Sequence, residues 1–158
     1  RYVPPTEVRH DAPLGVGTVQ YFVPSDLSVS AFDLVGDERF DTHLARLAAF
    51  DVIANNTDRK AGHCLPDAAG RLWAIDHGLC FHSEEKLRTV LWDYAAQPLD
   101  VELRTRLAGF SVAELDPEFG ELLSGEELNA VVDRAQRLAL VGVLPSDPSG
   151  RRYPWPLI

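Results

Sequence analysis

The chain has 158 residues, of which 46% are hydrophobic and 25% are charged, a composition typical of a single soluble globular domain. Its formal net charge of -9 argues against nucleic-acid binding, which needs a basic surface, and against purely electrostatic attachment to an anionic membrane. No apolar run approaches the roughly 20 residues that span a bilayer. The 2 cysteines form neither a disulfide framework nor a zinc-ribbon pattern, so we expect a cytoplasmic protein.

The first part of the chain, residues 1–36, reads as a linker that contains one short strand. Residues 1–17 are rich in proline and glycine and are expected to be irregular. Residues 18–23 are β-branched and aromatic and end at a proline, which predicts a strand. Residues 24–36 are expected to form a loop with a short apolar stretch.

A helix over residues 37–55 is predicted by apolar side chains that recur at spacings of three and four. It should stop at the polar run 55–58, whose side chains compete for backbone hydrogen bonds. Two short extended segments, at 64–65 and 71–76, flank a Pro-Asp-Ala-Ala-Gly turn and predict a β-hairpin.

Helices are expected to dominate the rest of the chain. The pattern predicts them at residues 83–94, at 100–109, and from Ser124 onward, where Glu127 completes a capping box. The Pro-rich tail should be irregular. The predicted fold class is therefore α+β, mainly α-helical, and its parts are a hinge and linker region (1–36), a helical lobe (37–144) and a tail (145–158).

Three side chains stand at the ends of the predicted elements around the hairpin. Asp58 follows the first long helix, His63 enters the first hairpin strand, and Asp76 follows the second strand shortly before Gly78. We expect the hairpin to bring them together. Protein kinases use this layout, in which one aspartate orients the acceptor hydroxyl and another holds a metal ion on the phosphates.

The residues also resemble a known family at this point. The run Asn56-Thr57-Asp58-Arg59-x-x-x-His63, followed by Ala74-Ile75-Asp76-His77-Gly78-Leu79-Cys80-Phe81, resembles the core of phosphatidylinositol 3-/4-kinase-like proteins, especially bacterial members of the type II 4-kinase branch. The resemblance covers about residues 18–85. It implies a protein-kinase-like C-terminal lobe with a short hinge strand and a small β-hairpin.

The resemblance also implies roles for individual residues. Asp58 and Arg59 match the catalytic Asp-Arg motif, and Asp76 matches the metal-binding aspartate. His63 stands where the family usually has asparagine, and imidazole suits Mg²⁺ less than an amide oxygen does. Either the metal preference shifts towards Mn²⁺, or His63 acts indirectly, or activity is reduced. ATP would meet the hinge and the residue before the metal-binding aspartate, at Gln20, Tyr21, Phe22, Val23 and Ile75.

Some parts of a kinase are not recognisable in the chain. Its lysines, Lys60 and Lys86, do not lie on an early strand, and no glycine-rich phosphate loop precedes the hinge candidate. The chain begins at Arg1 and contains no methionine, so we expect an N-terminal portion to be missing. Without an N-terminal lobe, this chain alone should bind nucleotide weakly and catalyse poorly.

Three functions remain open from the sequence. The first is an ATP-dependent phosphotransferase that uses Mg²⁺ or Mn²⁺ and acts on a protein, small-molecule or lipid acceptor. The second is a nucleotide-binding pseudokinase or interaction module without turnover. The third is a metal-dependent hydrolase that uses His63, Asp76 and His77.

Two further residues have open roles. Arg59 could neutralise Asp58, contact an acceptor phosphate or form a simple salt bridge. Asp51, an acid in the apolar stripe of the first long helix, could brace the following loop or face solvent.

Overall fold

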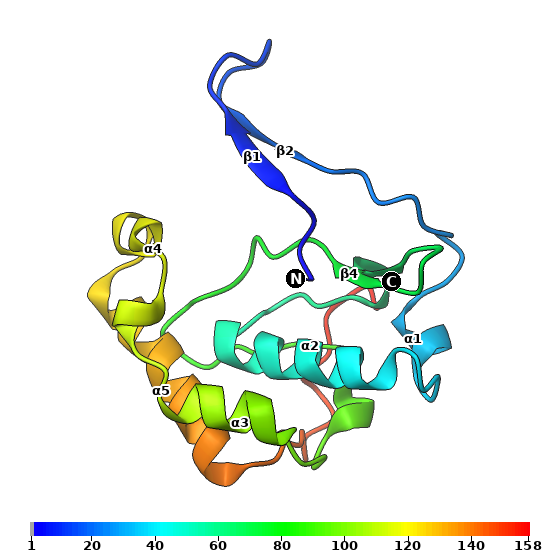
Figure 1. The fold of residues 1–158 in the computed structure, drawn as a ribbon, viewed down its shortest axis with the longest axis vertical. Helices are drawn as coiled ribbons and strands as arrows, with labels where there is room; N and C mark the ends of the chain where they lie inside the picture. Colours follow the sequence, from blue (N-terminus) through cyan, green and yellow to red (C-terminus); the bar gives the residue numbers. More distant parts are fainter. Residues whose placement is uncertain (1) are drawn as a thin grey trace.

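The computed structural model describes residues 2–158, which form an α+β fold in which helices predominate (Figure 1). The helices are α1 (Ala31–Leu34), α2 (Asp41–Ala54), α3 (Val101–Ala108), α4 (Pro117–Leu122) and α5 (Gly125–Val141). The strands form two antiparallel hairpins, β1 (Thr6–Arg9) with β2 (Gly17–Gln20) and β3 (Cys64–Pro66) with β4 (Leu72–Ala74). Single 3-10 turns lie at Ala61–His63, Trp92–Tyr94 and Val112–Glu114.

The core lies around α2, which packs against α5, and α5 in turn packs against α3. The predicted apolar stripe of α2 is confirmed, because Leu44 and Leu47 are fully buried. The stripe of α5 is also confirmed, with Ala135 and Leu138 buried against the same core. Burying these faces supplies most of the stability of helices of this length.

The capping box at the start of α5 is confirmed. The Glu127 carboxylate accepts hydrogen bonds from the backbone N–H of Ser124 at 2.9 Å and from its hydroxyl at 2.8 Å, and the Ser124 hydroxyl accepts from the Glu127 N–H at 3.3 Å. The β3–β4 hairpin is confirmed as well, with Leu65 paired to Trp73. The tail after Pro145 contains no helix or strand, as its composition predicts.

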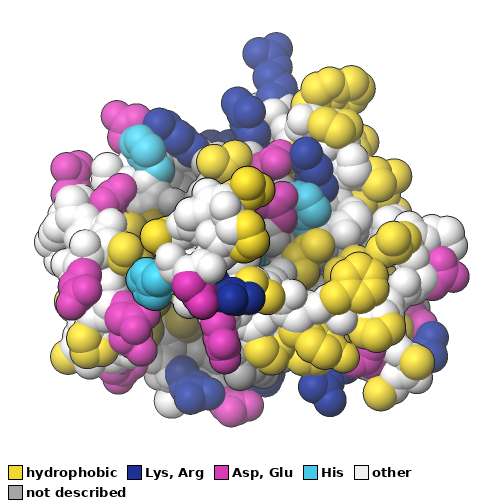
Figure 2. Space-filling view, turned by 90° about the horizontal axis from the view of Figure 1, so that it is seen from above, with side chains coloured by type: hydrophobic (Ala, Val, Ile, Leu, Met, Phe, Trp, Pro, Cys, Tyr) yellow, Lys and Arg dark blue, Asp and Glu magenta, His cyan; other side chains and the backbone are white. Residues whose placement is uncertain are grey.

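The β1–β2 hairpin projects from the body of the molecule (Figure 1), and all of its strand residues are exposed. The prediction that residues 1–17 are irregular was therefore wrong for β1, and the strand predicted at 18–23 is shorter and begins at Gly17. The pairing of Thr6 with Gln20 across the hairpin supplies hydrogen bonds that local composition does not reveal. On the face from which this hairpin projects, hydrophobic side chains gather on one side and acidic side chains on the other (Figure 2).

The prediction of a helix over residues 83–94 was wrong, since only its end forms a 3-10 turn. Its backbone groups pair with the loop after α2 instead. Arg59 N–H donates to the Arg88 carbonyl at 3.1 Å, and Val90 N–H donates to the Arg59 carbonyl at 3.1 Å. Because these backbone groups take their hydrogen-bond partners in the loop after α2, they are not available for the bonds within a helix over residues 83–94. The loop predicted at 24–36 contains the short helix α1, whose Ala31 and Leu34 are buried.

Helix α5 ends at Gly142, whose backbone is left-handed with a φ of 76°. We expect Gly142→Ala to destabilise the fold by about 1 kcal/mol, because a residue with a Cβ is strained in this region. The added Cβ would lie 2.9 Å from Cζ of Arg104, which must shift. Gly125→Ala, in the first turn of α5 with open space around it, is the matched control and should be neutral or stabilising. Equal urea midpoints for both variants would contradict this account of the helix end.

No helix among residues 2–158 is long and apolar enough to cross a membrane.

Candidate active site

The site is built on the loop that follows α2, residues 55–63, which we call the Asp58 loop. Helix α2 ends at Asn55, which adopts a left-handed conformation with φ 53° and ψ 48°. The Asn55 side chain donates to the carbonyls of His82 at 2.8 Å and Glu84 at 2.6 Å, and its oxygen accepts from the Lys86 N–H at 2.8 Å. The end of the helix is thereby tied to the chain that follows Asp76.

A buried ion pair fixes the start of the Asp58 loop. Asp51 and Arg59 have fully buried side chains, and Nη2 of Arg59 lies 3.0 Å from Oδ1 of Asp51. The Asp51 carboxylate also accepts from Nδ2 of Asn56 at 3.0 Å and from the Thr89 hydroxyl at 3.1 Å. Nη1 of Arg59 donates to the Ile75 carbonyl at 2.9 Å. One guanidinium thus joins α2 to the residue before Asp76.

The ion pair shows which of the roles left open by the sequence apply to Asp51 and Arg59. Asp51 braces the loop from inside the core, and a solvent-facing position is ruled out by its burial. Arg59 forms a structural salt bridge and does not face solvent, where an acceptor phosphate would lie. Burial alone would lower the pKa of Arg59, but the Asp51 carboxylate more than offsets this, so that the pKa is raised.

Asp58 points outward between these buried neighbours. Its backbone N–H donates to Oδ1 of Asn56 at 3.0 Å, and its side chain is 28% exposed. Its carboxylate lies 3.4 Å from Nζ of Lys60. The carboxylate is therefore held near the surface beside the Lys60 ammonium group and is partly exposed to solvent.

His63 lies between the two candidate aspartates. Its Nε2 is 3.4 Å from Oδ2 of Asp76, and its carbonyl accepts from the Ile75 N–H at 3.0 Å. Burial lowers the pKa of His63, whereas the carboxylates of Asp76 and Asp58 both act in the opposite direction. His63 therefore lies next to Asp76, and the Asp58 carboxylate is near enough to influence the His63 pKa; that these side chains form one catalytic site stays a prediction.

Asp76 has the exposure and the backbone conformation expected of a functional residue. It adopts a positive φ of 56°, which is uncommon for residues other than glycine, and its side chain is 61% exposed. Nδ1 of His63 accepts from the Lys60 N–H at 3.4 Å, so the proton of the neutral ring is placed on Nε2, facing Asp76. Nε2 thus approaches the Asp76 carboxylate at 3.4 Å, which is longer than an ordinary hydrogen bond.

The expected adenine-binding residues divide into two groups. Val23 and Ile75 belong to a small apolar cluster with Leu65 and Trp73, which is separate from the main core. Leu65 of this cluster lies two residues after His63 in the chain. Tyr21 and Val23 also line a cavity of about 340 Å³ beside Trp73. By contrast, Gln20 is engaged in the β1–β2 hairpin and Phe22 is 78% exposed, so the structure does not bring their side chains into this cluster.

A metal ion in this site would depend on few protein ligands. Among residues 2–158 there is no group of three or more His, Cys, Asp or Glu side chains that could hold a metal ion. This excludes the preformed three-ligand centre that the hydrolase alternative requires. His77 instead packs edge-on against Phe50 at 5.3 Å between ring centroids, and burial lowers its pKa to about 4. The exposed Asp76 carboxylate is still suited as a ligand of Mg²⁺ or Mn²⁺, since such ions are commonly held by one or two carboxylates together with substrate phosphates.

Sequence reasoning missed several residues that position the site. Asn55 and Asn56 organise the Asp58 loop, and the only signal was an Asn-Asn pair at the end of a helix, where asparagine favours a left-handed cap. The C-terminal tail also reaches the loop, because the Ala61 N–H donates to the Leu157 carbonyl at 2.8 Å. Such a long-range contact has no local sequence signal.

Comparisons with known proteins identify the family of the chain. The family model described as phosphatidylinositol 3- and 4-kinase matches residues 6–132. The chain is similar to Protein Rv2133c of Mycobacterium tuberculosis (strain ATCC 25618 / H37Rv). The two are 37% identical over an alignment that is 191 positions long and covers 98% of this chain and 68% of that protein. No solved structure matches the chain with comparable significance. The family model covers more than half of the chain, which shows that the chain belongs to the phosphatidylinositol 3- and 4-kinase family.

Proposed function

We propose that the chain forms the catalytic lobe of an ATP-dependent phosphotransferase. The observation that carries this proposal is the grouping of Asp58, His63 and Asp76 beside the apolar cluster of Val23, Leu65, Trp73 and Ile75. Phosphoryl transfer requires mainly positioning and charge stabilisation, for which a pair of accessible carboxylates next to an apolar nucleotide platform is suited. Membership of a kinase family supports the same reaction class.

Asp58 is proposed to orient the acceptor hydroxyl and take up its proton. Its 28% exposure and its weak tie to Lys60 leave the carboxylate accessible. A general base must lie within hydrogen-bond reach of the proton that it removes. Lys60 would then compensate charge on the acceptor or on the transferred phosphoryl group.

Asp76 is proposed to hold the divalent metal on the ATP phosphates, and His63 is proposed to orient Asp76 through Nε2–H. The metal would neutralise the charge on the phosphates. Arg59 is proposed as a positioning residue, since it connects Asp51 to the carbonyl of Ile75, immediately before Asp76. The acceptor is proposed to be a protein, small molecule or lipid headgroup that carries a free hydroxyl.

A second candidate, a nucleotide-binding module without turnover, is favoured by two observations. His63 occupies the position of the expected second metal ligand, and its Nε2 faces Asp76. The lysines of the chain, Lys60 and Lys86, lie in the Asp58 loop and after Asp76, away from the β2 segment. This candidate predicts metal-dependent ATP binding with no phosphoryl transfer.

Calorimetric titration of the full-length protein with Mn²⁺ and ATP tests the assignment of Asp76. Asp76→Asn is expected to weaken metal-dependent ATP binding by about tenfold or more, because a charged metal ligand is lost. Asp93→Asn, at an exposed carboxylate on the 3-10 turn Trp92–Tyr94, is the matched control and should bind as the wild type does. Equal affinities in all three proteins would overturn the assignment of Asp76 for both candidate functions.

A further inference from the structure

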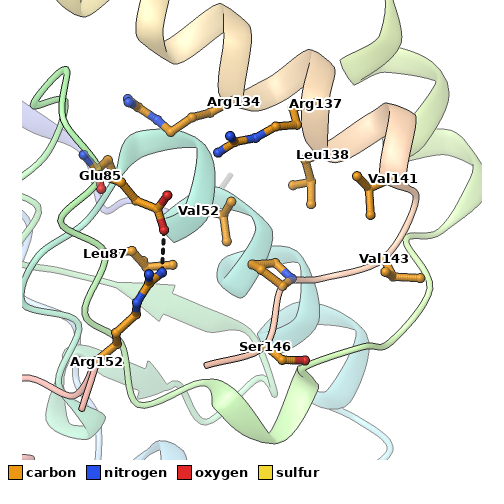
Figure 3. Close-up of a pocket in the computed structure, with 12 residues that line it drawn as sticks. Val52, Glu85, Leu87, Arg134, Arg137, Leu138, Val141, Val143, Ser146 and Arg152 are labelled. Carbon is orange, nitrogen blue, oxygen red and sulfur yellow. Dashed lines mark hydrogen bonds and ion pairs between the residues drawn. The ribbon is translucent and has the colours of Figure 1, made fainter. Parts of the chain in front are cut away.

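A second cavity, of about 340 Å³, lies apart from Asp58 and Asp76, and we call it the arginine pocket (Figure 3). It is bounded by the end of α2, by α5, by the segment around Glu85 and by the chain that follows α5. Its apolar lining consists of Val52, Leu87, Leu138, Val141, Val143 and Pro145. Its volume falls within the roughly 300–1,000 Å³ of small-molecule sites.

Arg134 is a buried charged residue of this pocket, with only 8% of its surface exposed. Its Nε donates to the Ile53 carbonyl at 2.8 Å, and its Nη1 donates to the His82 carbonyl at 3.2 Å. Its Nη2 is buried and has no hydrogen-bond partner among the described residues. Buried donors without partners are rare, and a charged one indicates an acceptor that the protein itself does not supply.

Arg137 extends from the same side of α5, one helical turn further on, and both guanidinium groups reach toward Glu85 (Figure 3). Neither arginine forms an ion pair within 4.0 Å anywhere in residues 2–158. Glu85, the acid that lines the pocket, pairs instead with Arg152, whose Nε also lies 3.9 Å from Oδ1 of Asp147. Both guanidinium groups therefore lack a direct ion-pair partner in the described chain, although Glu85 and Asp133 lie in the same region.

The surroundings reinforce this positive charge. An adjoining hollow is lined by Lys86, Arg88, Arg151 and Arg152 with Glu85 as its acid, so that cations outnumber acids there. In a third hollow Arg134 and Arg137 lie with Glu85 and Asp133. Cations placed close together repel one another, and a bound anion would relieve this local repulsion. Burial and, to a smaller extent, Arg137 lower the pKa of Arg134, whereas Glu85 and Asp133 act in the opposite direction.

We propose that the arginine pocket binds a phosphate monoester that carries a compact apolar group. The phosphate would lie on Arg134 and Arg137, and the apolar group would lie against Leu138 and its apolar neighbours. A phosphate ester carries up to two negative charges near neutral pH and accepts several hydrogen bonds, which matches two free guanidinium groups better than a single carboxylate does.

This ligand would be held by residues that also position the Asp58 loop. Arg134 bonds the last turn of α2 through the Ile53 carbonyl, and Asn55, which caps α2, lines the same pocket. Binding here would stabilise the connection between α2 and the segment around His82. The pocket is nevertheless chemically separate from the Asp58 and Asp76 site, because none of those side chains lines it.

Calorimetry at low salt with phenyl phosphate, inorganic phosphate and phenylacetate tests this proposal. Phenyl phosphate is expected to bind at least tenfold more tightly than either of the others, since inorganic phosphate lacks the apolar group and phenylacetate lacks the second charge. Arg137→Gln should weaken phenyl phosphate binding by at least tenfold. Arg106→Gln, on α3 with a 79% exposed side chain, is the matched control and should leave it unchanged.

Two further variants keep the test decisive. Arg134→Lys preserves the charge but loses the planar fork, and we expect it to weaken phenyl phosphate binding even where the fold is retained. Asp76→Asn should bind phenyl phosphate as the wild type does. The proposal is overturned by an absence of phenyl phosphate binding at millimolar concentration, by unchanged binding in Arg137→Gln, or by loss of binding in Asp76→Asn.

Discussion

Asp51→Asn is expected to lower the free energy of unfolding by about 3–5 kcal/mol, because it leaves the Arg59 charge buried without its partner. Asp51 and Arg59 are both fully buried, and the carboxylate also accepts from Asn56 and Thr89. In a domain of this size, such a loss should lower the midpoint of thermal unfolding by roughly 10 °C or more. Urea denaturation followed by circular dichroism measures the effect.

Two variants show whether the charge or the packing is responsible. Asp93→Asn makes the same chemical change at an exposed carboxylate and should alter stability by less than about 0.5 kcal/mol. The double variant Asp51→Leu/Arg59→Met removes both charges and should be less destabilised than the sum of the single changes, since an apolar pair needs no compensation. A loss below about 1 kcal/mol in Asp51→Asn would contradict the bracing role of the ion pair.

Asp58→Asn is expected to reduce phosphoryl transfer by the full-length protein by about 10²–10⁴-fold, the usual contribution of a general base. Its carboxylate contacts only Lys60 among the charged groups within 4.0 Å in the described chain, and a partly exposed pair of this kind contributes little to stability. The variant should therefore remain folded and should bind Mn²⁺ and ATP like the wild type. Turnover of ATP with and without acceptor measures the loss.

The comparison with Asp76→Asn makes this prediction specific. Both variants should lose turnover, but only Asp76→Asn should lose metal-dependent nucleotide binding. Asp93→Asn again serves as the control and should turn over ATP at the wild-type rate. Equal turnover in wild type and Asp58→Asn would contradict a base at this position. Binding without turnover in the wild type would instead support the module without catalysis.

The long elements of the fold could be predicted from the sequence because each contains its own signal. Helix α2 has an apolar stripe, and α5 combines such a stripe with a capping box at Ser124 and Glu127. The segment 83–94 shows the limit of this reasoning. Its acidic start is typical of a helix, but its backbone is recruited by the Asp58 loop, and tertiary pairing overrides local propensity.

The candidate site was predictable to a similar extent. The spacing of Asp58, His63 and Asp76 around a hairpin indicates that they meet, and the hairpin does form as expected. The partner of Arg59 could not be predicted, because its ion pair with Asp51 depends on how the loop turns back onto α2. It could not be predicted either that Nη2 of Arg134 lacks a hydrogen-bond partner, because this depends on three segments that meet only in the folded chain.

The most direct measurement is a crystal structure of the full-length protein with Mn²⁺ and a non-hydrolysable ATP analogue, with the metal located by its anomalous scattering. The account predicts Mn²⁺ on the Asp76 carboxylate, adenine against Val23 and Ile75, and Asp58 facing the terminal phosphate. A nucleotide bound elsewhere, or Asp58 and Asp76 facing separate cavities in that complex, would contradict it.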